Sequence, residues 1–254
     1  MIILECFALV ILLAIIGIGT LIAITFMGRQ PIPDGLEING LHIVKDGFVS
    51  IGMLPLAGGD IALFDAGNDK SGKAILGELS RLGLGPGNVR TIFLTHGHLD
   101  HIAAVHLFPD AQVMALSDEV DVAEGRVSPG GPVMWFMPVK LTGVKIHRAL
   151  HDGEVVDLGT AKVQVFAVPG HTAGSAAYLV NGILMLGDAT DADSHGRAKG
   201  SPWLSSKDQA QDRESLRRLA MRLAGQGGVQ ALVFSHSGVL KQGIEPLTLA
   251  ARGW

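Results

Sequence analysis

The sequence predicts a mixed α and β domain that follows a long apolar N-terminal segment. Short apolar and β-branched runs separated by glycine-rich turns occur in both halves of the chain, which is typical of strands. Two amphipathic stretches, residues 73–82 and 208–223, have the apolar spacing of helices. The chain has 254 residues, 48% hydrophobic and 17% charged, which is enough for a sizeable core. The formal net charge is −4 and no basic cluster occurs, which argues against nucleic-acid binding.

Residues 6–27 contain no charged side chain and are long enough to cross a membrane. A helix of this length spans roughly 33 Å at about 1.5 Å per residue, against a hydrocarbon core of about 30 Å. A secretory signal peptide is the alternative, but no Lys or Arg precedes the run. We therefore expect a single-pass membrane anchor over residues 1–29, with the lipid bilayer as partner of residues 6–27. Arg29 and Lys45 on its C-terminal side slightly favour a cytoplasmic location for the rest of the chain.

Residues 30–40 begin with Gln-Pro-Ile-Pro-Asp-Gly, which cannot continue a helix. We expect a linker here, and the main domain over residues 41–254. Ser71 is the expected N-cap of the helix at 73–82, and further helices are expected from residues 102 and 117. The expected strands of the first half are residues 41–45, 48–53, 61–64, 89–94 and 112–116; those of the second half are 144–149, 155–156, 162–168, 176–180, 183–186 and 229–234.

Two irregular segments interrupt this pattern. In residues 125–138, glycines and prolines surround Val-Met-Trp-Phe-Met. Trp135 and Phe136 are candidates to close over a substrate, while contact with a bilayer and packing on the fold are alternatives. His195, in the loop 189–207, is a weaker candidate for binding an anionic substrate group, because a solvated loop residue is the simpler interpretation.

The stretch 95–101, Thr-His-Gly-His-Leu-Asp-His, places three imidazoles and a carboxylate within six residues. Both groups are good zinc ligands. The stretch lies between an expected strand and an expected helix, on a loop where a rigid scaffold can present ligands. His96 and His98 can bind one metal together. Asp100 and His101 leave the backbone in different directions and can serve a second.

Three more ligand-type residues stand at the ends of strand-like runs. His171 follows the run 161–168, Asp188 follows 183–186, and His236 follows 231–234, each in a turn that bears Gly or Ser. One such position is common by accident. Together with the stretch 95–101 they indicate four ligand-bearing tips that share a site.

This ordered pattern resembles the metallo-β-lactamase-fold hydrolases, from about residue 41 to residue 238. The resemblance implies an α+β fold, a four-layer αββα sandwich. It also implies a first metal held by His96, His98 and His171, a second held by Asp100, His101 and His236, and Asp188 as the bridge between them. Asp65, in Leu-Phe-Asp-Ala-Gly, matches an aspartate that this family often carries near the site, where it would orient a ligating imidazole.

These ligands favour a metal-dependent hydrolase. Two divalent ions about 3.5–4 Å apart can share a water and lower its pKa towards neutrality. We expect two zinc ions, with iron or manganese as alternatives. The resulting hydroxide would attack an ester, thioester, lactone or phosphodiester of a small-molecule substrate, with Asp100 as the catalytic residue that orients it and accepts its proton. No Gly-x-Ser-x-Gly turn and no cysteine near a histidine supports covalent catalysis.

Further resemblances narrow the class. An aspartate at 188 resembles glyoxalase II, lactonases and phosphodiesterases more than the β-lactamases. Only 18 residues follow His236, which is short for the glutathione-binding extension of glyoxalase II, and Tyr178 does not match the lactonase pocket tyrosine. Two alternatives stay open: a mononuclear iron persulfide dioxygenase of the same fold, and a non-catalytic, membrane-tethered metal-binding protein. Nothing in the sequence indicates an oligomeric state.

Overall fold

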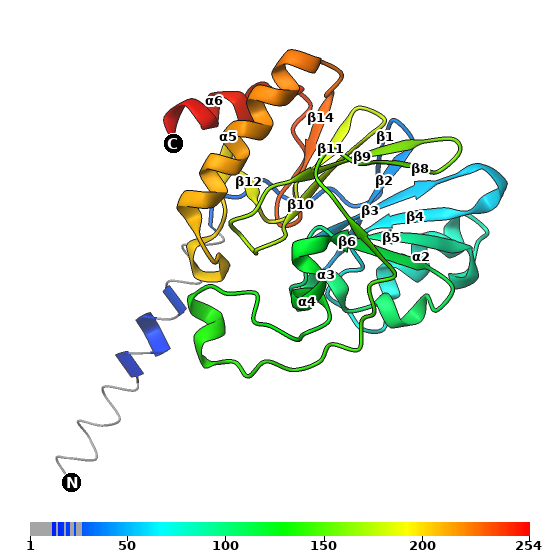
Figure 1. Cartoon of the computed structure of the whole chain (residues 1–254), viewed down its shortest axis with the longest axis horizontal. Coiled ribbons are helices and arrows are strands. Elements are labelled where there is room, and N and C mark those ends of the chain that lie inside the picture. Colours follow the sequence, from blue (N-terminus) through cyan, green and yellow to red (C-terminus); the bar gives the residue numbers. More distant parts are fainter. Residues whose placement is uncertain (1–11, 14, 18, 21–22, 24–26) are drawn as a thin grey trace, which may run out of the picture.

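The fold is built around two β-sheets that face each other (Figure 1). The structure is a computed structural model that describes residues 12–13, 15–17, 19–20, 23 and 27–254. The first sheet has the order β1-β2-β3-β4-β5-β6-β7 and the second the order β14-β11-β10-β9-β8. Buried apolar side chains from both sheets, including Phe64, Phe93 and Tyr178, form the central core between them.

The first sheet changes from antiparallel to parallel pairing at β4, which brings several strand ends to one edge. The second sheet is antiparallel except for its β11–β14 pair. The strands of the first sheet are β1 (Leu36–Ile38), β2 (Leu41–Asp46), β3 (Val49–Pro55), β4 (Ile61–Phe64), β5 (Val89–Phe93), β6 (Gln112–Leu116) and β7 (Arg148–Leu150). The second sheet contains β8 (Val155–Asp157), β9 (Lys162–Ala167), β10 (Ala176–Val180), β11 (Ile183–Met185) and β14 (Ala231–Val233), and β12 (Thr190–Ala192) with β13 (Ala198–Gly200) forms a separate hairpin.

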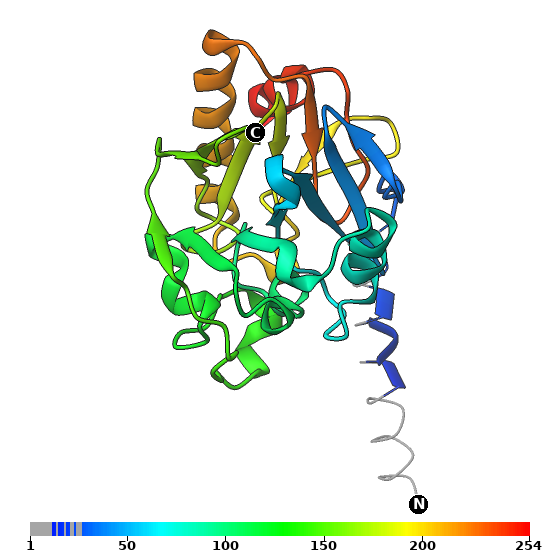
Figure 2. The ribbon, with the colours of Figure 1, turned by 90° about the vertical axis from the view of Figure 1, so that its right-hand side faces the viewer.

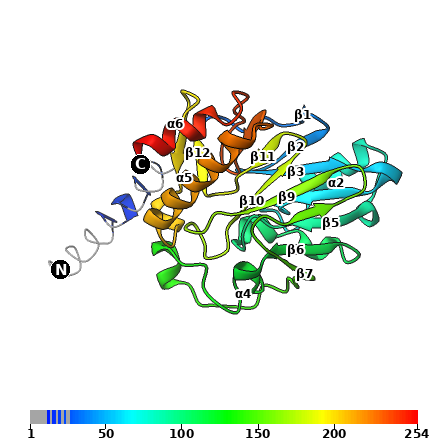
Figure 3. The ribbon, with the colours of Figure 1, turned by 45° about the horizontal axis from the view of Figure 1, so that its top comes forward.

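Helices cover the outer face of each sheet (Figures 2 and 3). A second apolar cluster joins α2 to the outside of the first sheet, and a third joins α5 and α6 to the outside of the second. The α-helices are α2 (Lys73–Arg81), α3 (Leu99–Ile102), α4 (Val120–Ala123), α5 (Gln209–Gln226) and α6 (Glu245–Gly253), and the 3-10 turns are η1 (Ala57–Gly59), η2 (Pro86–Asn88), η3 (Val105–Leu107), η4 (Ser117–Glu119), η5 (Pro132–Phe136) and η6 (Trp203–Ser205). The layer order is therefore that of the expected αββα sandwich.

Several boundaries differ from the sequence prediction. Ser71 as N-cap of α2 is wrong: Gly72 takes that position with a left-handed φ of 61°, and the Ser71 hydroxyl donates to Asp69 instead. The helix expected from residue 102 is wrong: α3 covers Leu99–Ile102 and ends where the expected helix begins, and only the short 3-10 turn η3 follows it. The strand expected over 144–149 is paired only from Arg148, and residues 144 and 146 pack on the second cluster outside any strand.

Residues 29 and 30 are attached to β12 and to the loop after β14. The Gln30 N–H donates to the Ala192 carbonyl over 3.0 Å, and the Gly238 N–H donates to the Gln30 carbonyl over 2.9 Å. Arg29 forms a buried ion pair of 2.8 Å with Asp191. Residues 30–40, expected as a linker, also contain β1. The segment thus packs as part of the folded domain.

No helix among the described residues is both long and apolar enough to cross a membrane. Most of the segment 6–27, which the sequence predicts to be an anchor, lies outside those residues.

Candidate metal centre

Four loops carry the seven ligand-type side chains to one edge of the two sheets. The loop after β5 carries His96, His98, Asp100 and His101 and runs into α3. The loops after β9, β11 and β14 of the second sheet carry His171, Asp188 and His236, respectively. The structure brings all seven together in two groups.

The first group consists of His96, His98, His171 and Asp188, one donor atom of each lying within 4.8 Å of the others. His98 Nδ1 lies 2.9 Å from both His96 Nε2 and His171 Nε2. The two Nε2 atoms are 3.2 Å apart. Three ring nitrogens therefore face one point from two different sheets.

The second group consists of Asp100, His101 and His236. His236 Nε2 lies 3.4 Å from Asp100 Oδ2, and His101 Nε2 lies 3.9 Å from the same oxygen. Asp188 lies between the groups: its Oδ1 is 3.4 Å from His101 Nε2, and its Oδ2 is 3.0 Å from His236 Nε2 and 3.6 Å from His171 Nε2. Asp188 therefore has the position that a bridging carboxylate requires.

Hydrogen bonds behind the rings determine which nitrogen of each imidazole points inwards. The Nδ1 of His101 lies 2.8 Å from Asp65 Oδ2, and the Nδ1 of His236 lies 3.1 Å from the Phe48 carbonyl. Both partners only accept hydrogen bonds, so each Nδ1 carries a proton and each Nε2 is the nitrogen that faces the centre. Neutral imidazoles bind metals in this form.

Two hydroxyl groups contact the outward-facing Nδ1 atoms of His96 and His171 in the first group. The Thr95 hydroxyl donates to Asp65 and lies 3.1 Å from His96 Nδ1, which it can therefore serve as an acceptor. The Ser206 hydroxyl donates to the Pro202 carbonyl and lies 3.0 Å from His171 Nδ1. Asp65 also accepts the Thr95 N–H over 2.7 Å, so one buried carboxylate orients ligands of both groups.

Burial and mutual repulsion keep the three imidazoles of the first group neutral. Burial lowers the pKa of His96 and His171 well below the usual range, and neighbouring imidazoles lower it further. Burial lowers the pKa of His98 to about 4. Protons are therefore disfavoured where the three nitrogens meet, as a cation site requires.

Charges are separated in the second group. Burial lowers the pKa of His101, but three nearby carboxylates, led by Asp188, raise it by more, to well above the usual range. The pKa of His236 is also raised, because Asp188 outweighs the effect of burial. Burial raises the pKa of Asp188, whereas His236 and His101 lower it by more, to well below the usual range. Without a metal, protons on these imidazoles therefore balance the buried carboxylate.

The residues fit divalent cations. Among the described residues, two buried polar atoms that lie between the ligand groups lack a hydrogen-bond partner: His101 Nε2 and Asp188 Oδ1. Buried polar atoms without partners are rare in native proteins and indicate a missing ligand, water or ion. Imidazole nitrogen and carboxylate oxygen are the donors that zinc and related ions prefer.

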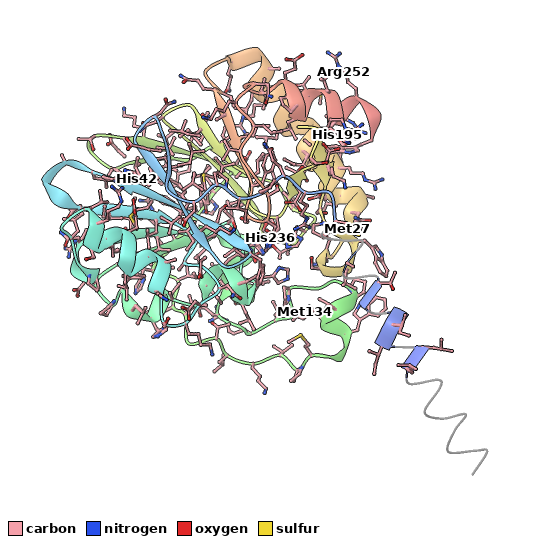
Figure 4. The ribbon with its side chains drawn as sticks, turned by 180° about the vertical axis from the view of Figure 1, so that it is seen from behind. Met27, His42, Met134, His195, His236 and Arg252 are labelled. Atoms are coloured by element: carbon pink, nitrogen blue, oxygen red, sulfur yellow. The ribbon has the colours of Figure 1, made fainter. Side chains whose placement is uncertain are left out.

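The weaker candidates lie apart from this cluster or at its edge. His195 is exposed and its backbone N–H donates to Asp193; in Figure 4 it lies beside the C-terminal helix, away from His236. The structure does not bring His195 to the metal-type ligands. Trp135 is 74% exposed on η5, whose last residue is Phe136 and which contacts η6. Phe48, which the sequence analysis did not select, stacks on His236 with ring centroids 5.6 Å apart.

The sequence profile of the metallo-beta-lactamase superfamily matches residues 45–223. The chain belongs to this superfamily. The resemblance carried by the stretch 95–101 and the later ligands is thus confirmed at the level of the superfamily, most of whose members are hydrolases.

The curated relatives align with this chain over only part of their own length. The human metallo-beta-lactamase domain-containing protein 1 is 30% identical over 168 residues, which are 63% of this chain and 54% of that protein. The hydroxyacylglutathione hydrolase of Serratia proteamaculans is 30% identical over 123 residues, 48% of this chain and 41% of that enzyme. The chain thus spans about half the length of these relatives or less.

Solved structures share the fold across most of the chain. A B3 metallo-beta-lactamase with an active-site glutamic acid superposes with a TM-score of 0.67 at 21% identity and covers 91% of this chain and 89% of its own. MIM-1 from Novosphingobium pentaromativorans gives a TM-score of 0.65 at 22% identity, with 89% of both chains covered. The predicted sandwich fold is confirmed, while identities this low carry no activity across.

Proposed function

We propose that this superfamily member is a hydrolase that uses two divalent cations, most simply zinc. The observation that carries the proposal is the meeting of two ligand groups at one carboxylate, Asp188. The ligands assigned to the first cation are His96, His98 and His171, those to the second are Asp100, His101 and His236, with Asp188 shared. Cations at these positions would polarise the substrate and raise the acidity of a bound water.

Asp100 is the residue that we assign to proton transfer. Its side chain is 25% exposed, whereas that of Asp188 is 5% exposed, so Asp100 faces the side from which water and substrate arrive. The carboxylate oxygen of Asp100 that does not face His101 and His236 can accept the proton of the attacking water and pass it to the leaving sulfur or oxygen. The water oxygen then bonds to the acyl carbon, and the bond to the leaving sulfur or oxygen breaks.

A thioester or ester is the substrate class that we favour over a lactone or phosphodiester. Support comes from the relatives named hydroxyacylglutathione hydrolase, at 30% identity in the Serratia enzyme and 33% in that of Shewanella baltica. Each of these matches covers less than half of the relative's length. Trp135 is kept as a candidate substrate contact because its exposed indole lies on the loop that contacts η6.

Metal content and turnover of the full-length protein test the proposal. We expect about two zinc-type ions per chain, with thioester turnover abolished in Asp188→Ala and His98→Ala and unchanged in the control His195→Ala. Circular dichroism checks that the variants fold. One iron per chain with oxygen uptake on a persulfide would favour a dioxygenase instead. A metal-free wild type, or full turnover in both ligand variants, would refute the assignment.

We further propose that residues 6–27 anchor the protein in a lipid bilayer, on the strength of their uncharged sequence. Carbonate extraction of membranes should leave the full-length protein in the pellet, and protease protection of vesicles should show which side the domain faces. Release into the supernatant would refute the anchor.

A further inference from the structure

The segment formed by η4 and α4, residues 117–123, is in contact with both loops that supply the three imidazoles of the first group. It follows β6 in the first sheet. On one side it meets Gly97, which stands between His96 and His98. On its other side it meets Gly174, three residues after His171. No residue of the segment is itself a metal-type ligand of the cluster.

Glu119 links the two loops through three hydrogen bonds. Its Oε1 accepts the Gly97 N–H over 2.7 Å. Its Oε2 accepts the Gly174 N–H over 2.8 Å and the Thr172 hydroxyl over 2.7 Å. The residue is 0% exposed. One buried carboxylate therefore binds the backbone between two ligands on one sheet and the residues beside a third ligand on the other.

The two glycines allow this contact at backbone distance. A Cβ on Gly174 would lie 2.2 Å from the Glu119 nitrogen, and a Cβ on Gly97 would lie 2.6 Å from the Ala123 nitrogen and Cα. Real Cβ atoms do not approach backbone atoms so closely, so any side chain at either position would push a ligand loop away from the 117–123 segment. This evidence is independent of the hydrogen bonds and identifies the same contact.

Burying the Glu119 carboxylate between the two loops costs free energy of desolvation. Burial raises the pKa of Glu119 to about 7, although its three hydrogen bonds act in the opposite direction. A well-packed apolar side chain of similar size is often at least as stabilising as a buried charge, so stability alone does not explain a glutamate here. All three neighbours are donors, however, and only a carboxylate can accept from both loops at once.

We propose that Glu119 is a positioning residue that sets the distance between the His96–His98 loop and His171. The inference rests on the proposed function, because it assigns to Glu119 the geometry of a cation site. Loss of the Glu119 carboxylate separates the ligands of the first group. The second group is affected less, because Asp100, His101 and His236 make none of these contacts.

Glu119→Gln is the sharpest test, because it keeps the side-chain length and removes one acceptor. Whichever way the amide turns, its NH₂ group faces either the Gly97 N–H or the Gly174 N–H. We expect Co²⁺, titrated into the metal-stripped full-length protein, to bind the first site about 10-fold more weakly than in the wild type, with a changed visible spectrum. The second site should keep its affinity.

Glu124→Gln is the matched control. Glu124 lies five residues further along, and its carboxylate accepts the Ile146 N–H over 2.9 Å from a loop that carries none of the seven ligand-type residues of the cluster. This variant should bind Co²⁺ as the wild type does. Thr172→Val, which removes a single donor, and Gly174→Ala should weaken the first site in the same direction. If Glu119→Gln fails to fold, the Co²⁺ affinity of the first site in these two variants tests the inference instead.

The outcomes separate this inference from the proposed function. If the wild type takes up two Co²⁺ ions and Glu119→Gln has a lower melting temperature but unchanged affinities and spectrum, Glu119 is only structural and the inference is overturned. Equal weakening of both sites would overturn it as well. If the wild type takes up no Co²⁺, the proposed function fails and the inference fails with it.

Discussion

Replacement of Asp65 separates the stability of the domain from the orientation of a metal ligand. Asp65 follows β4 with a φ of 65°, a left-handed conformation that Asp and Asn tolerate better than most residues. Its carboxylate accepts the Thr95 N–H, the Thr95 hydroxyl and His101 Nδ1–H, all within 2.8 Å and all buried. Asp65→Ala removes these acceptors, whereas Asp65→Asn keeps the shape and the backbone preference.

The two substitutions should lower the free energy of unfolding by different amounts. A buried donor without a partner costs about 1–3 kcal/mol. Because the Thr95 hydroxyl can rotate to another partner, we expect Asp65→Ala to lower the free energy of unfolding by about 3–5 kcal/mol. In Asp65→Asn the amide oxygen still accepts the Thr95 N–H, so the loss should be about 1–2 kcal/mol. Its NH₂ group, however, faces His101 and favours the tautomer with the proton on Nε2.

That proton would occupy the lone pair that faces Asp188, so Asp65→Asn should weaken metal binding at the second group by about 10–100-fold. Urea unfolding of the metal-stripped protein measures the first effect and Zn²⁺ titration measures the second. Asp46→Asn is the control, since its carboxylate accepts the N–H groups of Asn68 and Asp69 and touches no imidazole. Wild-type zinc affinity in Asp65→Asn would refute the orienting role.

Three other predictions follow from the same contacts. Arg29→Ala removes the ion pair of the buried Asp191 carboxylate, so the free energy of unfolding measured by urea titration should fall by about 3–5 kcal/mol. In the control Arg197→Ala, which removes the exposed partner of Asp193, it should fall by less than about 1 kcal/mol. Hydrogen bonding to Arg81 lowers the pKa of Glu78 from 4.5 to about 2, so the stability that this carboxylate contributes is present above pH 4.5 and lost as the pH falls through 2. Urea titrations of Glu78→Gln should thus show a deficit at pH 7 that shrinks between pH 4.5 and 2; a constant deficit would contradict this. Chelation of the metal-loaded protein should lower its stability by about 4 kcal/mol if zinc was at 1,000 times its dissociation constant, and calorimetry that shows no change would contradict metal binding.

The positions of the ligand-type residues could be predicted because they stand where strand-like runs end in turns. His171, Asp188 and His236 each end an apolar run at a Gly- or Ser-bearing turn, and that pattern is local. Their convergence is not local, because it depends on the order of strands in two sheets. The resemblance supplied that order, and the strand order and the superfamily match agree with it.

The residues that orient the ligands could not be predicted in this way. Glu119 stands in Ser-Asp-Glu, which has the composition of an exposed helix start, yet it is fully buried. Ser206 and the Phe48 carbonyl act through long-range contacts that leave no spacing signal. Of the residues that orient the ligands, the sequence predicts only Asp65, and only through the resemblance. Local patterns therefore predict which residues can bind a metal, whereas tertiary contacts decide how those residues are held.

Each ligand group draws on both sheets, so the centre depends on the packing between the sheets as well as on the ligands. Tyr178 fills this interface, with its ring centroid 5.8 Å from that of Phe64 and 5.3 Å from that of Phe93. Its hydroxyl donates over 2.7 Å to the carbonyl of Leu94, two residues before His96. Protein cores are too densely packed to absorb a change of even one methylene without some movement. Substitutions in this core are therefore expected to change metal affinity although every ligand residue is retained, because the packing between the sheets sets how far apart the ligands of the two sheets lie.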